Sequence, residues 1–60
     1  MKKRILNHPA VESLHHEGED GWWCYLKTTW ICPEMECSLI HEHTLHEVWN
    51  KLLGVEKKNA

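Results

Sequence analysis

The residues best suited to chemistry in this sequence are thiol and imidazole groups between positions 32 and 46. Cys32, Cys37, His43 and His46 are of the types that zinc prefers as ligands, in the order C-x4-C-x5-H-x2-H. This spacing differs from that of the common zinc finger, and no C-x-x-C pair is present. If Cys37 and His41 belong to one strand, about 13 Å separates them, too far to share one ion. One hypothesis is therefore a small zinc-stabilised domain, and the alternative is buried thiols with surface histidines.

The same cysteines and histidines have the chemistry of a nucleophile and its base. No third residue that would orient the base is recognisable, and there is no glycine-rich phosphate loop. A chain of 60 residues also seldom encloses a pocket that could surround a substrate. We therefore expect a protein that is not an enzyme.

The elements that must position these groups belong to a single small domain, residues 1–60. A chain this short buries only about 60% of the surface that its unfolded form exposes, so it needs a disulfide, a metal or a second subunit. Its cysteines are odd in number, which favours a reducing compartment. The first apolar run, Ile5–Leu6, is too short for a secretory signal. These features predict a cytoplasmic protein.

Charge is distributed unevenly along the chain. Residues 2–4 are basic, as are Lys57 and Lys58, whereas residues 5–55 hold two basic and eight acidic residues, a net charge of −6. Binding to a phosphate backbone requires clustered Lys and Arg. Nucleic-acid association is therefore an alternative only if the two basic ends converge.

The stretch from Thr44 to Gly54 has the signals of an amphipathic helix. Thr44 and Glu47 make the S/T-x-x-E capping box that starts a helix. Gly54 has the residue type that ends one in a left-handed conformation. One apolar stripe runs along this segment: Leu45, Val48, Trp49, Leu52 and Leu53. A helix over residues 44–54 must bury this stripe against a partner surface.

Residues 21–27, G-W-W-C-Y-L-K, form the best strand in the sequence because aromatic residues dominate it. Alternation along this strand gives two apolar faces, one with Trp22, Cys24 and Leu26 and the other with Trp23, Tyr25 and Lys27. A second strand over residues 37–41 leads into the helix. Together they predict an α+β fold, a small ββα domain in which a long-looped antiparallel β-hairpin over residues 21–41 packs on the C-terminal helix.

The two ends of the chain carry weaker signals. Residues 1–6 are expected to form a basic arm and residues 55–60 a basic tail. Residues 7–16 begin with Asn7 and Pro9, which suit the start of a helix, but the segment is short. It is therefore expected to be either a short helix or an extended arm.

One helix cannot cover both faces of the hairpin, so apolar residues are expected to meet another molecule. The candidates for this interface are Trp22, Trp23, Tyr25, Trp30 and Ile31, because aromatic residues are enriched in binding hot spots. We expect a homodimer that binds another protein. In the alternative, residues 5–16 cover the second face and the protein is a monomer.

Two segments, G-W-W-C-Y-L-K (21–27) and I-H-E-H-T-L-H-E-V (40–48), carry a resemblance. They resemble small uncharacterised proteins of phages and bacteria with a G-W-W-x-Y-L-K strand and an I-H-E-x-T helix entry. His43 departs from the acidic residue expected at that position. The resemblance implies an accessory protein of a phage or mobile element that binds and modulates or inhibits a host protein, and it implies no active site.

Overall fold

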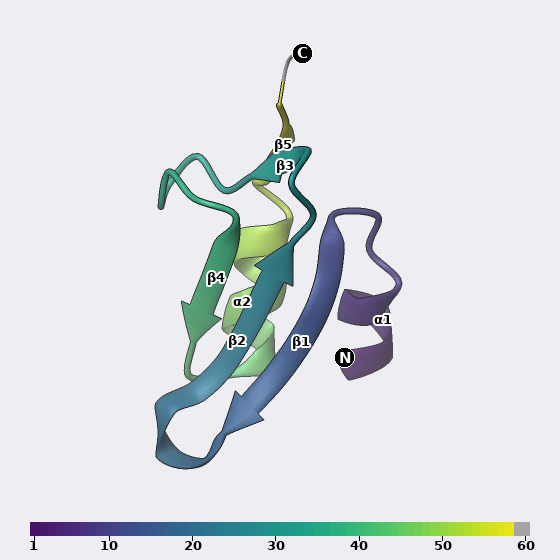
Figure 1. The fold of residues 1–60 in the computed structure, drawn as a ribbon. Helices are drawn as coiled ribbons and strands as arrows, with labels where there is room; N and C mark the ends of the chain where they lie inside the picture. Colours follow the sequence, from purple (N-terminus) through teal and green to yellow (C-terminus); the bar gives the residue numbers. More distant parts are fainter. Residues whose placement is uncertain (59–60) are drawn as a thin grey trace.

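The computed structural model describes residues 1–58, so the last two positions of the predicted basic tail 55–60 lie outside the described residues. Figure 1 shows the course of the chain. Its elements are, in order, α1 (Lys2–Leu6), β1 (Val11–Glu17), the 3-10 turn η1 (Gly18–Asp20), β2 (Gly21–Leu26), β3 (Trp30–Ile31), β4 (Leu39–Glu42), α2 (Leu45–Leu52) and β5 (Glu56–Lys57).

A three-stranded antiparallel sheet in the order β1-β2-β4 forms the centre of the molecule, and α2 packs on one of its faces (Figure 1). A smaller sheet joins β3 to β5, with Trp30 opposite Lys57 and Ile31 opposite Glu56. The predicted α+β fold, an antiparallel hairpin packed on a C-terminal helix, is confirmed. Neither helix in residues 1–58 is long and apolar enough to cross a membrane.

The core lies between this sheet and α2. Cys24 and Ile40 from the sheet and Val48 and Leu52 from α2 are almost completely buried, and Trp22 packs against them. Trp23 and Tyr25 do not belong to this cluster. The predicted alternation along residues 21–27 is therefore observed, with Trp22, Cys24 and Leu26 on the α2 side. Burial of each large aliphatic side chain contributes roughly 1.5–3 kcal/mol.

The N-terminal quarter differs from the prediction. Residues 11–17 form β1, so the helical alternative for residues 7–16 is wrong. The extended alternative is closer, but it did not include the pairing of this segment with β2. Residues 2–6 form α1 where a basic arm was predicted. The physical reason is packing between distant segments: Ile5 of α1 is fully buried in the core, and an irregular register between Val11 and Ser13 turns Val11 inward as well.

The second strand of the predicted hairpin also starts later than expected. β4 covers residues 39–42 instead of 37–41, because Cys37 pairs with Cys32 in an isolated bridge. The long connection predicted between the strands thus contains structure of its own, namely β3 and the turn that follows it.

Both ends of α2 have defined hydrogen bonds. The Glu47 amide donates to Thr44 Oγ1 at 3.2 Å, which confirms the first bond of the predicted capping box. The Glu47 carboxylate reaches back to the Thr44 hydroxyl, which donates to Oε1 at 3.0 Å, where the box would have the Thr44 amide as donor. The predicted left-handed Gly54 is wrong, since its φ is not positive and the helix is capped by Leu53 in a right-handed conformation. The Gly54 amide bonds to the Lys51 carbonyl at 3.0 Å, a tighter turn that satisfies the helix end without a left-handed residue.

Candidate functional site

Among residues 1–58, no helix lies over the face of the three-stranded sheet that points away from α2 (Figure 1). We call it the outer face. The strand register aligns its residues in two rows, Ser13–Tyr25–Leu39 and His15–Trp23–His41, with Glu17 at the end of β1. Its residues are therefore Ser13, His15, Glu17, Trp23, Tyr25, Leu39 and His41.

The N-terminal segment does not cover this face. Ile5 of α1 packs into the core, and Lys2 Nζ lies 5.9 Å from the ring centroid of Trp22, whose side chain is on the α2 side of the sheet. α1 therefore lies on the same side as α2, and β1 widens the sheet by one strand. The alternative in which residues 5–16 shield the second face is not what the structure shows.

Aromatic rings dominate the centre of the outer face. Trp23 and His41 stack with centroids 3.7 Å apart and planes 8° from parallel, and His15 meets the Tyr25 ring edge-on at 5.6 Å. His41 Nε2 also forms a hydrogen bond with the carbonyl oxygen of Asp20. Because a carbonyl oxygen only accepts, Nε2 carries the proton. Tyr25 remains 43% exposed.

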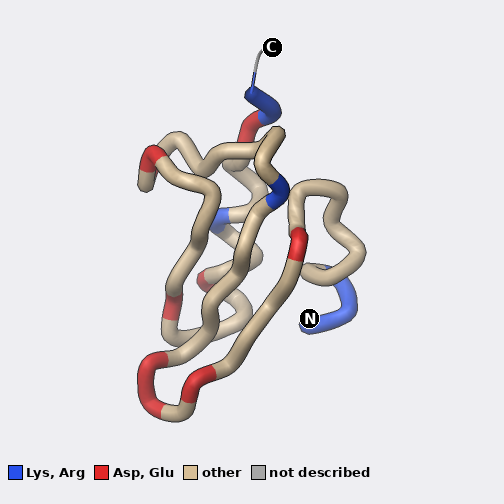
Figure 2. Tube along the Cα trace, in the orientation of Figure 1, with Lys and Arg blue, Asp and Glu red and all other residues tan. Residues whose placement is uncertain are grey.

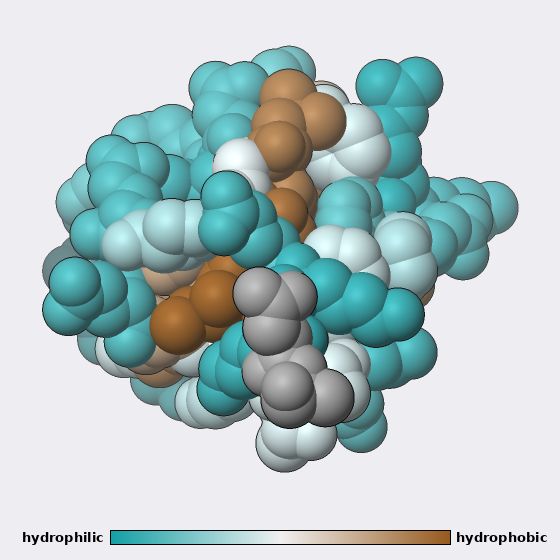
Figure 3. Space-filling view, turned by 90° about the horizontal axis from the view of Figure 1, so that it is seen from above, coloured by the Kyte–Doolittle hydropathy of each residue, from teal (hydrophilic) through white to brown (hydrophobic). Residues whose placement is uncertain are grey.

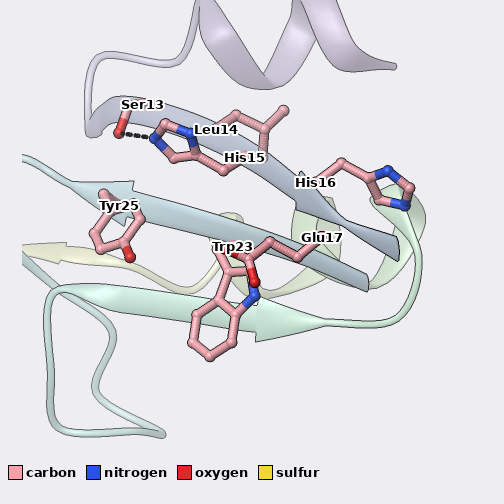
Figure 4. A pocket seen from close by; sticks show the side chains of 7 residues that line it. All are labelled: Ser13, Leu14, His15, His16, Glu17, Trp23 and Tyr25. Carbon is pink, nitrogen blue, oxygen red and sulfur yellow. Dashed lines mark hydrogen bonds between the residues drawn. The ribbon is translucent and has the colours of Figure 1, made fainter. Parts of the chain in front are cut away.

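A depression of about 670 Å³ lies along β1 and β2 on this side (Figure 4). It is open to solvent. Its lining residues are five of the outer face, Ser13, His15, Glu17, Trp23 and Tyr25, together with Leu14 and His16, which alternate with them along β1. Sites for small molecules usually surround most of the ligand surface. A depression this open suits contact with a larger molecule better than enclosure of a small one.

Some hydrogen-bonding groups of the depression have partners within residues 1–58 and others do not. His15 Nε2 is 3.2 Å from Ser13 Oγ, as the dashed line in Figure 4 marks. The indole Nε1 of Trp23 is shielded from solvent and has no hydrogen-bond partner among residues 1–58. An unpaired buried donor costs about 1–3 kcal/mol, so this arrangement retains a polar group that the chain itself does not satisfy.

Charge is segregated around the outer face (Figure 2). Glu17, Glu19 and Asp20 lie at the end of the sheet where β1 turns into β2, and Glu42, opposite Trp22, ends β4 at the same place. The basic residues of α1 and of the segment around β5 lie away from this end. The aromatic surface is therefore bordered by carboxylates at this end of the sheet, whereas Lys27 follows β2 at the opposite end.

The predicted interface residues do not form one surface. Trp23 and Tyr25 share the outer face, whereas Trp22 is on the opposite side, where its ring lies 4.5 Å from that of His16. Trp30 packs against the core, and Ile31 is half-buried beside it in β3. The end of the molecule that carries β3 and β5 is mainly hydrophilic, with hydrophobic atoms visible in narrow bands between polar ones (Figure 3).

Sequence reasoning missed the contribution of β1 to the outer face. His15 lies there because β1 pairs with β2, a pairing that no local pattern predicted. Leu39 and His41 lie on the same face because β4 pairs with β2 on its other edge.

The predicted zinc ligands are not brought together. Cys32 and Cys37 are neighbours, and the Cys37 thiol donates to the Leu39 carbonyl oxygen at 3.2 Å. His43 and His46 are exposed where the chain enters α2. Within residues 1–58 no cluster of three or more His, Cys, Asp or Glu side chains has the geometry of a metal site. Zinc binding stays a prediction, which folding in the presence of a chelator would test.

The thiol of the third cysteine, Cys24, is unreactive in the folded protein. Cys24 lies in the core with no exposed surface, and burial raises its pKa to about 11. It is therefore protonated at neutral pH and does not act as a nucleophile in the folded protein.

Comparison with protein-family models, curated proteins and solved structures found no match for this chain.

Proposed function

We propose that this protein is a small non-enzymatic binding module that recognises another protein through its outer face. One observation supports this most directly: Trp23 and Tyr25 lie at the centre of a sheet face that neither helix covers. Exposed aromatic surface of this kind is typical of protein interfaces. The stacked geometry of Trp23 also reduces the side-chain entropy that binding would otherwise cost.

The chemistry of the outer face indicates the chemistry of its partner. Carboxylates at Glu17, Glu19 and Asp20 border the aromatic rings at one end of the sheet, and the paired strand residues that define the outer face include Glu17 but no Lys or Arg. A complementary partner surface has an apolar centre with Lys or Arg at its edge, because such charges meet carboxylates at the rim and aromatic rings inside. The resemblance described above would make that partner a host protein of the cell that a phage or mobile element enters.

A second copy of the chain is the other occupant to consider. Two outer faces stacked on one another would hide Trp23 and Tyr25 of both copies, as the expected homodimer requires. The paired strand residues of the outer face supply no Lys or Arg to meet Glu17 of the other copy, and Lys27, which follows β2, lies at the opposite end of the sheet. We therefore favour a basic partner protein over self-association through this face.

The test uses paired variants. Proteins captured from the source cell by the whole chain are purified and titrated individually by calorimetry against the wild type, Tyr25→Ala and Leu53→Ala. Leu53 is the matched control because it is 67% exposed and follows α2, on the other side of the sheet. We expect Tyr25→Ala to weaken a specific complex at least about tenfold, since aromatic hot spots contribute about 2 kcal/mol or more. Leu53→Ala should bind as the wild type does.

Equal affinity of both variants would contradict a role for the outer face. A captured partner with an acidic contact surface would contradict the charge argument, and affinity that does not fall with added salt would do the same. Light scattering of the free chain tests whether a second copy binds the outer face. A dimer that Tyr25→Ala dissociates would assign the face to self-association instead.

A further inference from the structure

Two of the three cysteines lie directly opposite each other. Cys32 and Cys37 form an isolated antiparallel bridge in which the Cys32 amide donates to the Cys37 carbonyl oxygen at 2.9 Å. Opposite Cα atoms in a hydrogen-bonded antiparallel pair are about 5.5 Å apart. This lies within the roughly 4.4–6.8 Å that a disulfide spans. Opposed residues also project from the same side of a ladder, so the two side chains start on the same side.

The turn between the cysteines maintains this opposition. The Met35 amide donates to the Cys32 carbonyl oxygen at 3.1 Å, which makes residues 32–35 a β-turn with Pro33 at the position that proline favours. Glu36 then has a left-handed φ of 53° and returns the chain to Cys37. Four-residue hairpin loops are commonly built around such a turn. An ion pair of 2.6 Å between Glu34 and Lys51 holds the loop against α2.

We propose that Cys32 and Cys37 are a reversible oxidation site, which closes into an intramolecular disulfide by exchange with a small-molecule disulfide such as oxidised glutathione. Cys37 is half-buried whereas Cys32 is buried, so Cys37 is the thiol that the small disulfide reaches. The site does not depend on the outer face, because it lies in the loop beyond β3.

The exchange takes place in two steps. The Cys37 thiolate attacks one sulfur of the small disulfide, whose S–S bond breaks, and one small thiol leaves as a mixed disulfide forms on Cys37. The Cys32 thiolate then attacks Cys37 Sγ, and the second small thiol leaves. The two protein thiols together lose two electrons and two protons, which reduce the small disulfide to two thiols. The hydrogen bond from Cys37 Sγ to the Leu39 carbonyl is given up in the process.

Cys24 cannot replace either member of the pair. It is fully buried on the α2 side of β2, where its strand neighbours are Leu14 and Ile40. Its raised pKa, about 11, also keeps it protonated. Oxidation of the folded chain is therefore expected to be selective for the other two thiols.

The test counts free thiols. Folded protein is equilibrated with excess oxidised glutathione, quenched in acid, unfolded and titrated with a thiol reagent. The count is expected to fall from three to one in the whole chain. In Cys24→Ser, which lacks one of the three cysteines, it should fall from two to none. Proteolysis after Glu34 and Glu36 cuts inside the loop, so the flanking peptides should stay linked until a reductant separates them.

Cys37→Ser is the matched negative control, since it removes the accessible thiol and leaves a side chain of similar size. Its thiol count should not change under the same treatment. The proposal is overturned if the whole chain keeps all its thiols, if it carries a stable glutathione adduct on Cys37, or if it forms covalent dimers. The wild-type chain gives the decisive count by itself, so the result does not depend on how well any variant folds.

Discussion

The indole ring of Trp23 lies flat against the imidazole ring of His41, with 3.7 Å between the ring centroids. These residues are direct partners across β2 and β4, so the stack continues the pairing of the backbone. The hydrogen bond from His41 to Asp20 attaches the same pair to the turn before β2. The centre of the outer face is therefore held in one arrangement before any partner arrives.

Replacing His41 by alanine should free the Trp23 ring. We expect the free energy of unfolding to fall by about 1 kcal/mol, the usual contribution of an aromatic pair. The Trp23 indole N–H, shielded in the wild type, should exchange faster with solvent, which hydrogen exchange followed by NMR measures. His43→Ala is the control because His43 is exposed. Similar changes in both variants would show that the stack is not what holds Trp23.

Gly21 is predicted to tolerate no side chain. Its φ is +91°, and a Cβ atom there would lie 2.5 Å from the Glu42 carbonyl oxygen and 2.8 Å from the His43 Cα. Gly21→Ala should therefore cost about 3 kcal/mol or more in unfolding free energy. Gly18→Ala, where φ is +44° and nothing lies within 4 Å, should cost about 1 kcal/mol. Urea titrations of both variants measure the difference, and equal costs would contradict the close approach of the strands.

Thr44 is predicted to contribute to stability through its side-chain oxygen. Thr44→Ala removes the acceptor for the Glu47 amide and should lower the free energy of unfolding by about 1 kcal/mol. Thr44→Ser keeps the oxygen and should stay close to the wild type. Thermal melting followed by circular dichroism compares the three proteins, and a serine variant as weak as the alanine variant would point to lost methyl packing instead.

Cys24 is predicted to make stability depend on alkaline pH. Burial raises its pKa from 9.0 to about 11, so the folded chain keeps this proton after the unfolded chain has lost it. The unfolded state then binds fewer protons, and stability falls as the pH rises through this interval. Denaturation with reductant present, at about pH 8 and about pH 10, should show a larger loss for the wild type than for Cys24→Ala. Lysine and tyrosine titration is common to both proteins and cancels in the comparison.

The parts of the fold that could be predicted have local signals. α2 has its capping box and apolar stripe within one segment, and β2 shows an aromatic alternation that needs no partner to be read. Both were found close to their observed bounds. The end of α2 was predicted less well, because the left-handed and the tight right-handed endings both leave the carbonyls satisfied and Gly54 is compatible with either.

β1 could not be predicted because its sequence has no such local signal. Its sequence V-E-S-L-H-H-E is polar at most positions, since one of its faces is open to solvent, and its irregular register interrupts the alternation near Val11. The pairing with β2 makes it a strand. The same holds for the candidate site. Alternation along β2 placed Trp23 and Tyr25 on one face, whereas His15 could be placed there only from the pairing of β1 with β2.

The pairing of β3 with β5 joins segments that are far apart in the sequence. Trp30 and Ile31 pair with Lys57 and Glu56, with β4 and α2 lying between them along the chain. Closing this loop costs more chain entropy than forming the β1–β2 hairpin, so the small sheet is expected to form late in folding. Until it forms, β3 has an unpaired edge that another chain could bind, which makes this segment the expected starting point of aggregation during refolding.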